Sequence, residues 1–207
     1  MARNARDLFF QWLRPHYALL SVMLVCCVIQ WVGDIAIVYL RFDRAAITDG
    51  EVWRLLSANF VHGTWTHLAM NLAALGMVSV LFSRQISAFR WLTSLGVASV
   101  WIGVGIWHNQ ADVEYYVGFS GVLHGLFIIG GLVHSRRQPF EGLGFVAIIA
   151  AKLVWEQLAG ALPGSEEWAG GPVLVDAHLY GALAGLPMGL YWRWRDGLKP
   201  GITPKGS

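Results

Sequence analysis

Apolar residues along this chain gather into six long runs that polar segments separate. A membrane-spanning helix needs about 20 mostly apolar residues. Six segments come near that length: 17–40, 66–83, 89–107, 118–134, 143–161 and 176–194. The first is overlong, so we expect its helix to end near Gly33, and no signal-peptide cleavage site follows it. The pattern predicts an all-α membrane protein of six transmembrane helices, in one domain over residues 1–207 with a core at about 16–195.

Composition agrees with this prediction and excludes other classes of protein. Of the 207 residues, 56% are hydrophobic and 14% are charged, whereas soluble domains average about 45–50% and about 25%. The apolar content excludes a disordered chain, and a net charge of +2 is too small for a nucleic-acid-binding protein. Cys26 and Cys27 are adjacent within an apolar run, so we expect packing there and no disulfide framework.

The longest polar segment, 41–65, lies between the first two spans. It mixes charged residues with Trp53, Leu55 and Phe60, which favours an ordered loop at the membrane interface over a disordered linker.

The distribution of Lys and Arg predicts the orientation in the membrane, because cytoplasmic segments are enriched in basic residues. Most basic residues fall on the side of the two chain ends: Arg3, Arg6, Arg14, Arg84, Arg90, Arg136, Arg137, Arg193, Arg195, Lys199 and Lys205. The other side holds Arg41, Arg44 and Arg54 together with most of the acidic residues. We therefore expect both termini in the cytoplasm, in a membrane that we take to be the bacterial inner membrane.

Three spans begin with polar side chains at a similar shallow depth on the outer side. They are His62, His67 and Asn71 for the second span, Ser120 and His124 for the fourth, and Asp176 and His178 for the sixth. Polar groups are costly in a bilayer, so each needs a partner or a function. A single membrane His or Asn is about as often only a bridge between helices. Their joint occurrence at one depth favours an active site.

These residues suit nucleophilic acyl transfer. A serine needs a base to accept its proton, and histidine is the usual one, so Ser120 with His178 supplies nucleophile and base. The negative charge that develops on the substrate needs hydrogen-bond donors. Asn71, His62 and the backbone N–H of Ser120 are the candidates. We expect no metal and no cofactor, because the chain has no H-E-x-x-H helix of the kind that holds zinc.

Glycines offer a way to bring Ser120 and His178 together. Gly121 and Gly125 in the fourth span, and Gly181 and Gly185 in the sixth, are small-xxx-small pairs that let helix backbones approach closely. His178 shares a helix stripe with Gly181 and Gly185, so this packing would carry it toward Ser120. Packing alone is the alternative explanation.

Three charged residues near these clusters have simpler interpretations. Lys152 and Glu156 are four apart in the fifth span, which favours an intrahelical ion pair; the alternative is that Glu156 lines the substrate route. Asp176 precedes His178 by two residues and points nearly opposite, so we expect it to cap the sixth helix and not to act as a third catalytic residue.

Four motifs resemble the rhomboid family of intramembrane serine proteases. They are Trp53-Arg54 in the first loop, His62 with His67 and Asn71, Gly118-Phe119-Ser120-Gly121, and Ala177-His178 followed by Gly181 and Gly185. The resemblance implies that Ser120 is the nucleophile, that His178 is the base, and that His62 and Asn71 belong to the oxyanion hole. It implies that His67 is a structural residue beneath the site. Gly118 and the helix-packing glycines would support the site.

One position departs from the pattern of many rhomboids, which carry Tyr four residues after the serine. Here that residue is His124. We expect it to support His178 by packing or hydrogen bonding; the alternative is a rival base. The string Ser-Gly-Val-Leu-His-Gly and the bare six-span build resemble the rhombosortase subfamily. That resemblance implies a secreted, membrane-anchored protein substrate with a C-terminal Gly-Gly sorting segment.

Two other function classes compete with a protease. A rhomboid-like non-catalytic protein would bind membrane clients without cutting them, but the presence of both Ser120 and His178 argues against it. A channel or transporter would place charges or unwound segments deep in several spans, and only Lys152 and Glu156 come close. We therefore expect an endopeptidase whose partners are the lipid bilayer and a membrane-anchored protein, with its site open to the periplasmic or outer face.

Overall fold

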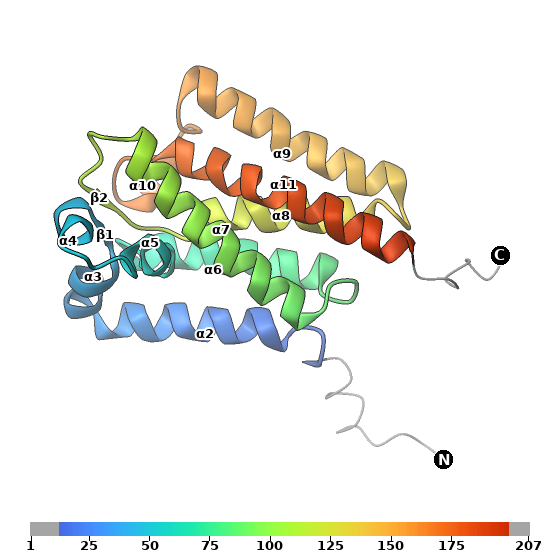
Figure 1. Ribbon diagram of the computed structural model, residues 1–207, viewed down its shortest axis with the longest axis horizontal. Helices are drawn as coiled ribbons and strands as arrows, with labels where there is room; N and C mark the ends of the chain where they lie inside the picture. Colours follow the sequence, from blue (N-terminus) through green and yellow to red (C-terminus); the bar gives the residue numbers. More distant parts are fainter. Residues whose placement is uncertain (1–12, 199–207) are drawn as a thin grey trace, which may run out of the picture.

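The computed structural model describes residues 13–198 as a helical bundle (Figure 1). Its long helices are α2 (Tyr17–Val32), α6 (Trp65–Phe82), α7 (Ala88–Asn109), α8 (Ser120–His134), α9 (Pro139–Ala159) and α11 (Val175–Gly197). The shorter elements are α3 (Asp34–Leu40), β1 (Phe42–Asp43), α4 (Arg44–Thr48), α5 (Arg54–Ser57), the 3-10 helix η1 (Ala58–Phe60), β2 (Tyr115–Tyr116) and α10 (Ser165–Ala169). The predicted basic residues Arg3, Arg6, Lys199 and Lys205 lie outside the described range.

Each of the six predicted spans corresponds to a helix, or to a bent pair of helices, at nearly the expected position. The largest displacement is at α9, which begins at Pro139 and not at 143. Length and hydropathy alone qualify three of the described helices as membrane spans, α6, α7 and α9, and a fourth if α2 and α3 count as one span. α8 has only 15 residues, and α11 does not meet the criterion. The count of six spans therefore stays a prediction.

The first span breaks at Gly33, as expected. Gly33 has a φ of 74°, a backbone conformation that glycine adopts without the steric penalty of a Cβ atom. The axes of α2 and α3 differ in direction by 114°. α2 therefore belongs to the helix bundle, whereas α3 bends away from it and leads into the segment that connects to α6.

α8 lies at the centre of the bundle, and every residue from Gly121 to Val133 is buried. Its closest neighbour is α11, and glycines make this approach possible. A Cβ atom on Gly121 would lie 2.7 Å from the carbonyl oxygen of Ala177, and one on Gly125 would lie 2.7 Å from that of Gly181. Gly181 and Gly185 face α8 in the same way. The predicted close packing of these two helices is therefore confirmed.

The outside of the bundle carries large apolar side chains. Exposed examples are Trp31, Val80, Phe89, Trp101, Phe140, Ile148 and Leu158, which come from α2, α6, α7 and α9. Isolated exposed apolar residues are normal on soluble proteins, but patches of this extent mark an interaction with other molecules or a membrane. Lipid contact is the natural explanation for helices as apolar as these.

The segment 41–65 is ordered, as predicted. β1 pairs with β2 antiparallel, with Phe42 opposite Tyr116. The buried guanidinium of Arg54 donates to the carbonyl oxygens of Val38 at 2.7 Å and Arg41 at 3.0 Å, and it pairs with Glu51 at 2.6 Å. Arg54, from the predicted Trp-Arg motif, thus ties this segment to the end of α3.

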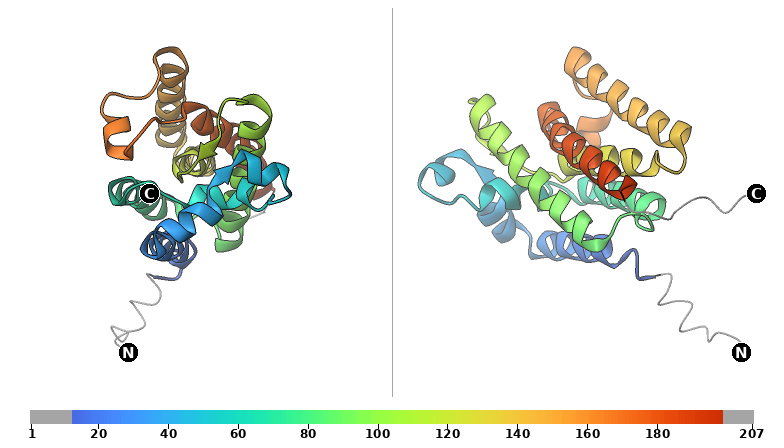
Figure 2. Two further views of the ribbon diagram at one scale, coloured as in Figure 1. Left: turned by 90° about the vertical axis from the view of Figure 1, so that its left-hand side faces the viewer. Right: turned by 45° about the vertical axis from the view of Figure 1, so that its right-hand side comes forward.

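The described chain begins and ends at the same end of the bundle (Figures 1 and 2). There the side chain of Arg90, in the first turn of α7, forms a double hydrogen bond with Asp196, near the end of α11. β1, β2 and α10 lie at the opposite end. This arrangement agrees with termini on one side of a membrane, but which side faces the cytoplasm stays a prediction.

Candidate active site

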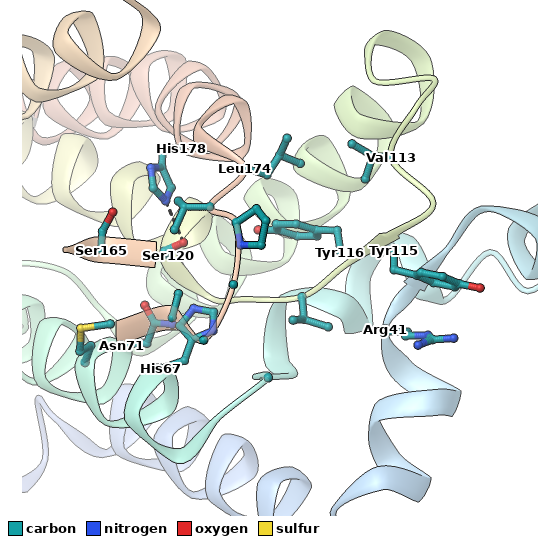
Figure 3. A pocket seen from close by; sticks show the side chains of 18 of the residues that line it. Arg41, His67, Asn71, Val113, Tyr115, Tyr116, Ser120, Ser165, Leu174 and His178 are labelled. Carbon is teal, nitrogen blue, oxygen red and sulfur yellow. Dashed lines mark hydrogen bonds between the residues drawn. The ribbon is translucent and has the colours of Figure 1, made fainter. Parts of the chain in front are cut away.

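A cavity of about 540 Å³ opens at the end of the bundle that holds β2 and α10 (Figure 3). Its lining includes His67, Asn71, Ser120 and His178. These residues come from the starts of α6, α8 and α11, the three helices whose first turns carry the predicted polar clusters. β2, α10 and the segment 170–174 supply further walls, together with Ile37 of α3, Arg41, Gly63, Val113 and Val117. Chain segments far apart in sequence therefore meet at one apolar cavity with a few polar groups, which is the usual form of a small-molecule or peptide site.

Ser120 and His178 lie within hydrogen-bonding distance in this cavity. Ser120 is the first residue of α8, and its Oγ is 2.9 Å from Nε2 of His178 on α11 (Figure 3). The turn before α8 depends on Gly118, whose φ is 130° and where a Cβ atom would lie 2.9 Å from Cε1 of His67. Gly118 is thus required both for its backbone conformation and for the close approach of His67.

Glu156 on α9 makes a contact with His178 that the sequence analysis missed. Its Oε2 is 2.9 Å from Nδ1 of His178, and its Oε1 is 2.5 Å from Nζ of Lys152. The predicted pair of Lys152 with Glu156 is confirmed, but it is one part of a larger network. Glu156 is absent from the lining of the cavity, so it does not border a substrate route there. The spacing of Lys152 and Glu156 shows the contact within α9 and carries no information about a neighbouring helix.

His124 packs against His178 and belongs to the same network. The two rings stack with centroids 4.3 Å apart and planes 20° apart. Nδ1 of His124 is 2.7 Å from the backbone oxygen of Ser120, and Nε2 is 3.0 Å from Nζ of Lys152. A carbonyl oxygen only accepts and an ammonium only donates, so Nδ1 carries the proton and Nε2 accepts from Lys152. Both nitrogens are engaged, and the position agrees with support of His178.

The structure places His62 and His67 differently from the expectation. His67 lines the cavity beside Asn71, one helical turn away on α6 (Figure 3). His62 is only 1% exposed and is not part of the lining. Its ring stands edge-on behind His67, with centroids 5.0 Å apart. The histidine of α6 at the cavity is therefore His67, whereas His62 is buried behind it.

Besides Nε of Arg41, which lines the cavity, three buried polar atoms near it have no partner within the part of the chain that the structure describes. They are Nδ2 of Asn71 and the two ring nitrogens of His62. Burial, together with the neighbouring His67, lowers the pKa of His62 to about 3. The backbone of Phe60 acts in the opposite direction on this pKa but does not reach hydrogen-bonding geometry with the ring. His62 is consequently neutral, and Asn71, which lines the cavity, keeps a buried donor that has no partner among the described residues.

Asp176 has a different role from the predicted helix cap. α11 begins at Val175 with Leu174 as its N-cap, so Asp176 lies inside the first turn. Its Oδ2 accepts a hydrogen bond of 2.6 Å from Nε2 of Gln110, at the end of α7. The cap prediction was wrong. Asp176 instead ties α11 to α7, while Glu156 is the carboxylate beside His178.

A metal ion would have to compete with Lys152. Donor atoms of His124, Glu156 and His178 lie within 4.8 Å of one another, a grouping that resembles a metal site. However, Nζ of Lys152 already bonds to Glu156 and to His124. An ammonium group in that position supplies the positive charge that a cation would bring. These residues therefore fit an internal ion pair better than a metal.

Comparisons with known proteins indicate the family to which this chain belongs. The rhomboid domain family model matches residues 49–195. A Bacillus subtilis (strain 168) protein named "Putative rhomboid protease YdcA" is 22% identical over 139 residues, which are 67% of this chain and 66% of that protein. The Mycobacterium tuberculosis (strain H37Rv) protein named "Uncharacterized protein Rv1337" is 28% identical over 160 residues, 69% of this chain and 60% of that protein. The aligned regions span less than two thirds of these relatives. Because the family model covers most of the chain, this protein belongs to the rhomboid family of integral membrane proteins, whose proteases act on membrane protein substrates within the bilayer.

Proposed function

We propose that this chain is an intramembrane serine endopeptidase, with Ser120 as nucleophile and His178 as general base. The observation that carries the proposal is the 2.9 Å separation of Ser120 Oγ and His178 Nε2 at the cavity wall. A nucleophile and a base within hydrogen-bonding reach are the geometric signature of covalent catalysis. Family membership independently supports a protease.

In the proposed reaction, His178 Nε2 takes the proton of Ser120 as Oγ attacks the carbonyl carbon of the scissile peptide bond. His178 then returns this proton to the nitrogen of the leaving segment as the carbon–nitrogen bond breaks. The acyl group stays on Ser120 until water, activated by the same histidine, hydrolyses the ester. No metal or cofactor takes part in the proposed reaction.

The oxyanion of the tetrahedral intermediate would be held by Asn71, His67 and the backbone N–H of Ser120. Asn71 supports this assignment because its Nδ2 is an unpaired donor among the described residues and the residue lines the cavity. Ser120 is the first residue of α8, where a backbone N–H has no partner within the helix. We propose His67 in place of His62, because only His67 lines the cavity.

The substrate that we propose is a secreted protein held in the membrane by a C-terminal segment that begins with Gly-Gly, as in rhombosortase-like processing. We further propose that the enzyme lies in the bacterial inner membrane with both termini cytoplasmic and the cavity open to the outer face. The bias of basic residues toward the end of the bundle opposite the cavity supports this orientation.

Labelling with an alkyl fluorophosphonate probe tests the proposal on the purified full chain. Ser165 also lines the cavity, so Ser165→Ala is the matched control for Ser120→Ala. We expect one labelled site in the wild type, full loss in Ser120→Ala and His178→Ala, and retention in Ser165→Ala. Labelling that persists in Ser120→Ala would assign the nucleophile elsewhere. No labelling of the wild type would favour the non-catalytic, client-binding alternative.

A further inference from the structure

We infer that Glu156 is a positioning residue that completes a Ser120–His178–Glu156 triad, with Lys152 and His124 holding it in place. The inference rests on the proposed serine protease function and adds a third residue to the pair of Ser120 and His178. It concerns a carboxylate on α9, a helix that contributes nothing to the lining of the cavity.

The contacts of Glu156 fix the proton on His178. A carboxylate only accepts hydrogen bonds, so the 2.9 Å contact between Glu156 Oε2 and His178 Nδ1 requires a proton on Nδ1. The lone pair of the neutral ring then lies on Nε2, which faces Ser120 Oγ. Only this tautomer lets His178 accept the serine proton, since the opposite one would present an N–H to the hydroxyl.

Lys152 and His124 hold the carboxylate in turn. Lys152 Nζ donates to Glu156 Oε1 at 2.5 Å and to His124 Nε2 at 3.0 Å, and His124 Nδ1 donates to the backbone oxygen of Ser120 at 2.7 Å. The contacts therefore run from Ser120 through His178, Glu156, Lys152 and His124 and return to Ser120. They join α8, α9 and α11 in a closed ring, so the rotamer of Glu156 is fixed from both sides.

An intrahelical ion pair alone does not explain this arrangement. Glu156 is 3% exposed, and its second oxygen is directed at a residue of another helix. The side chain of Lys152 is 27% exposed and keeps access to the surroundings. A charge buried in a bilayer protein is costly and tends to mark a functional site. The contact of Glu156 with His178, the base of the proposed reaction, accounts for the burial of this charge.

The charges favour the intermediate that the proposed reaction needs. When Ser120 Oγ bonds to the substrate carbon, its proton moves to Nε2 and His178 becomes a cation. Groups that face His178 are His124 on α8, Glu156 and Lys152 on α9, and His67 on α6. The negative Glu156 is in direct contact with the ring, while the ammonium of Lys152 lies beyond the carboxylate. Glu156 keeps its charge, and the proton stays on His178 until the leaving nitrogen takes it.

The test compares Glu156→Gln with a matched control on the same helix, Glu141→Gln. Among residues 13–198, Glu141 pairs only with His134, and it lies in the first turn of α9, at the other end of the helix from Glu156. Purified full-length variants are titrated with an alkyl fluorophosphonate to separate the maximal labelling rate from the half-saturating concentration. We expect Glu156→Gln to lower the maximal rate about 100-fold or more, since positioned acid–base groups contribute about 10²–10⁴-fold. The half-saturating concentration should stay within about threefold, Glu141→Gln should match the wild type, and Glu156→Asp should restore part of the rate.

A second measurement needs no variant at Glu156. Nitrogen-15 NMR of histidine-labelled wild type, with His178 assigned by its loss in His178→Ala, should report a ring protonated at Nδ1 and not at Nε2. A ring protonated only at Nε2, or Glu156→Gln labelling at nearly the wild-type rate, overturns the inference and leaves the Ser120–His178 proposal intact. Absence of labelling at Ser120 in the wild type overturns the proposed function, and the triad with it.

Discussion

Gly125 on α8 and Gly181 on α11 face each other so closely that a Cβ atom on Gly125 would lie 2.7 Å from the carbonyl oxygen of Gly181. Backbone atoms cannot move aside as a flexible side chain can, so any larger residue must push the two helices apart. The same two helices carry Ser120 and His178. The glycines therefore set the distance between the proposed nucleophile and its base.

Gly181→Ala should reduce both stability and activity. Overpacking a close contact typically costs about 1–3 kcal/mol, and a shift of α11 would lengthen the contact between Ser120 and His178. The measurements are thermal unfolding in detergent and the rate of fluorophosphonate labelling. Gly144→Ala is the control, because a Cβ atom there would meet nothing within 4 Å. Equal behaviour of the two variants would contradict this account of the helix contact.

His67→Ala and His62→Ala should differ in what they damage. His67 lines the cavity with Asn71, and removal of one oxyanion donor typically lowers turnover about 100- to 1000-fold. We expect this loss for His67→Ala and Asn71→Ala, with little change in thermal stability. His62→Ala leaves a void behind His67 and should lower stability more than the other two.

Turnover and binding of a substrate-derived inhibitor, measured together, decide between these roles. An effect confined to KM would move His67 and Asn71 from the oxyanion hole to substrate binding. A catalytic loss in His62→Ala without a loss of stability would return that residue to the role first expected for it.

His178→Ala should abolish cleavage, whereas His124→Ala should keep measurable activity. His124 contacts the proposed base by stacking, and its ring nitrogens are engaged by Lys152 and the backbone of Ser120. Residues that act as one unit are strongly non-additive, so Ser120→Ala combined with His178→Ala should be hardly worse than either alone. An inactive His124→Ala beside an active His178→Ala would show that the base is His124.

The sequence predicted features that depend on local pattern. Three examples are the helix break at Gly33, the close packing of α8 with α11, and the ion pair of Lys152 with Glu156. Each follows from residue types or residue spacings within one or two helices. The count of spans is less accessible, because the buried α8 is too short and α11 too polar to qualify on apolar length alone.

The sequence did not predict features that depend on how one helix is turned about its axis relative to its neighbours. The four-residue spacing of His67 and Asn71 places these two on one helix face, but it does not say whether that face or His62 lies at the cavity, because this depends on where α6 begins. Trp65 is its first residue, so His67 and Asn71 share a helix face while His62 precedes the helix. The contact between Glu156 and His178 likewise depends on how α9 is turned toward α11. The signal that the sequence offered for this contact was Glu156 itself, a carboxylate within an apolar span.

Replacing Gly-Gly by Leu-Leu in a membrane-anchored substrate should block its processing. Gly has a poor helix propensity and exposes the backbone carbonyl that Ser120 must reach, whereas Leu restores a helix that shields it. The cavity around Ser120 is bounded by Val117, Tyr116 and Leu174, so two large side chains beside the scissile bond would also crowd it. The measurement is cleavage of matched substrates by the purified enzyme, with Ser120→Ala as the control for other proteases. Equal cleavage of both substrates would end the rhombosortase-like proposal and leave a rhomboid protease without Gly-Gly preference.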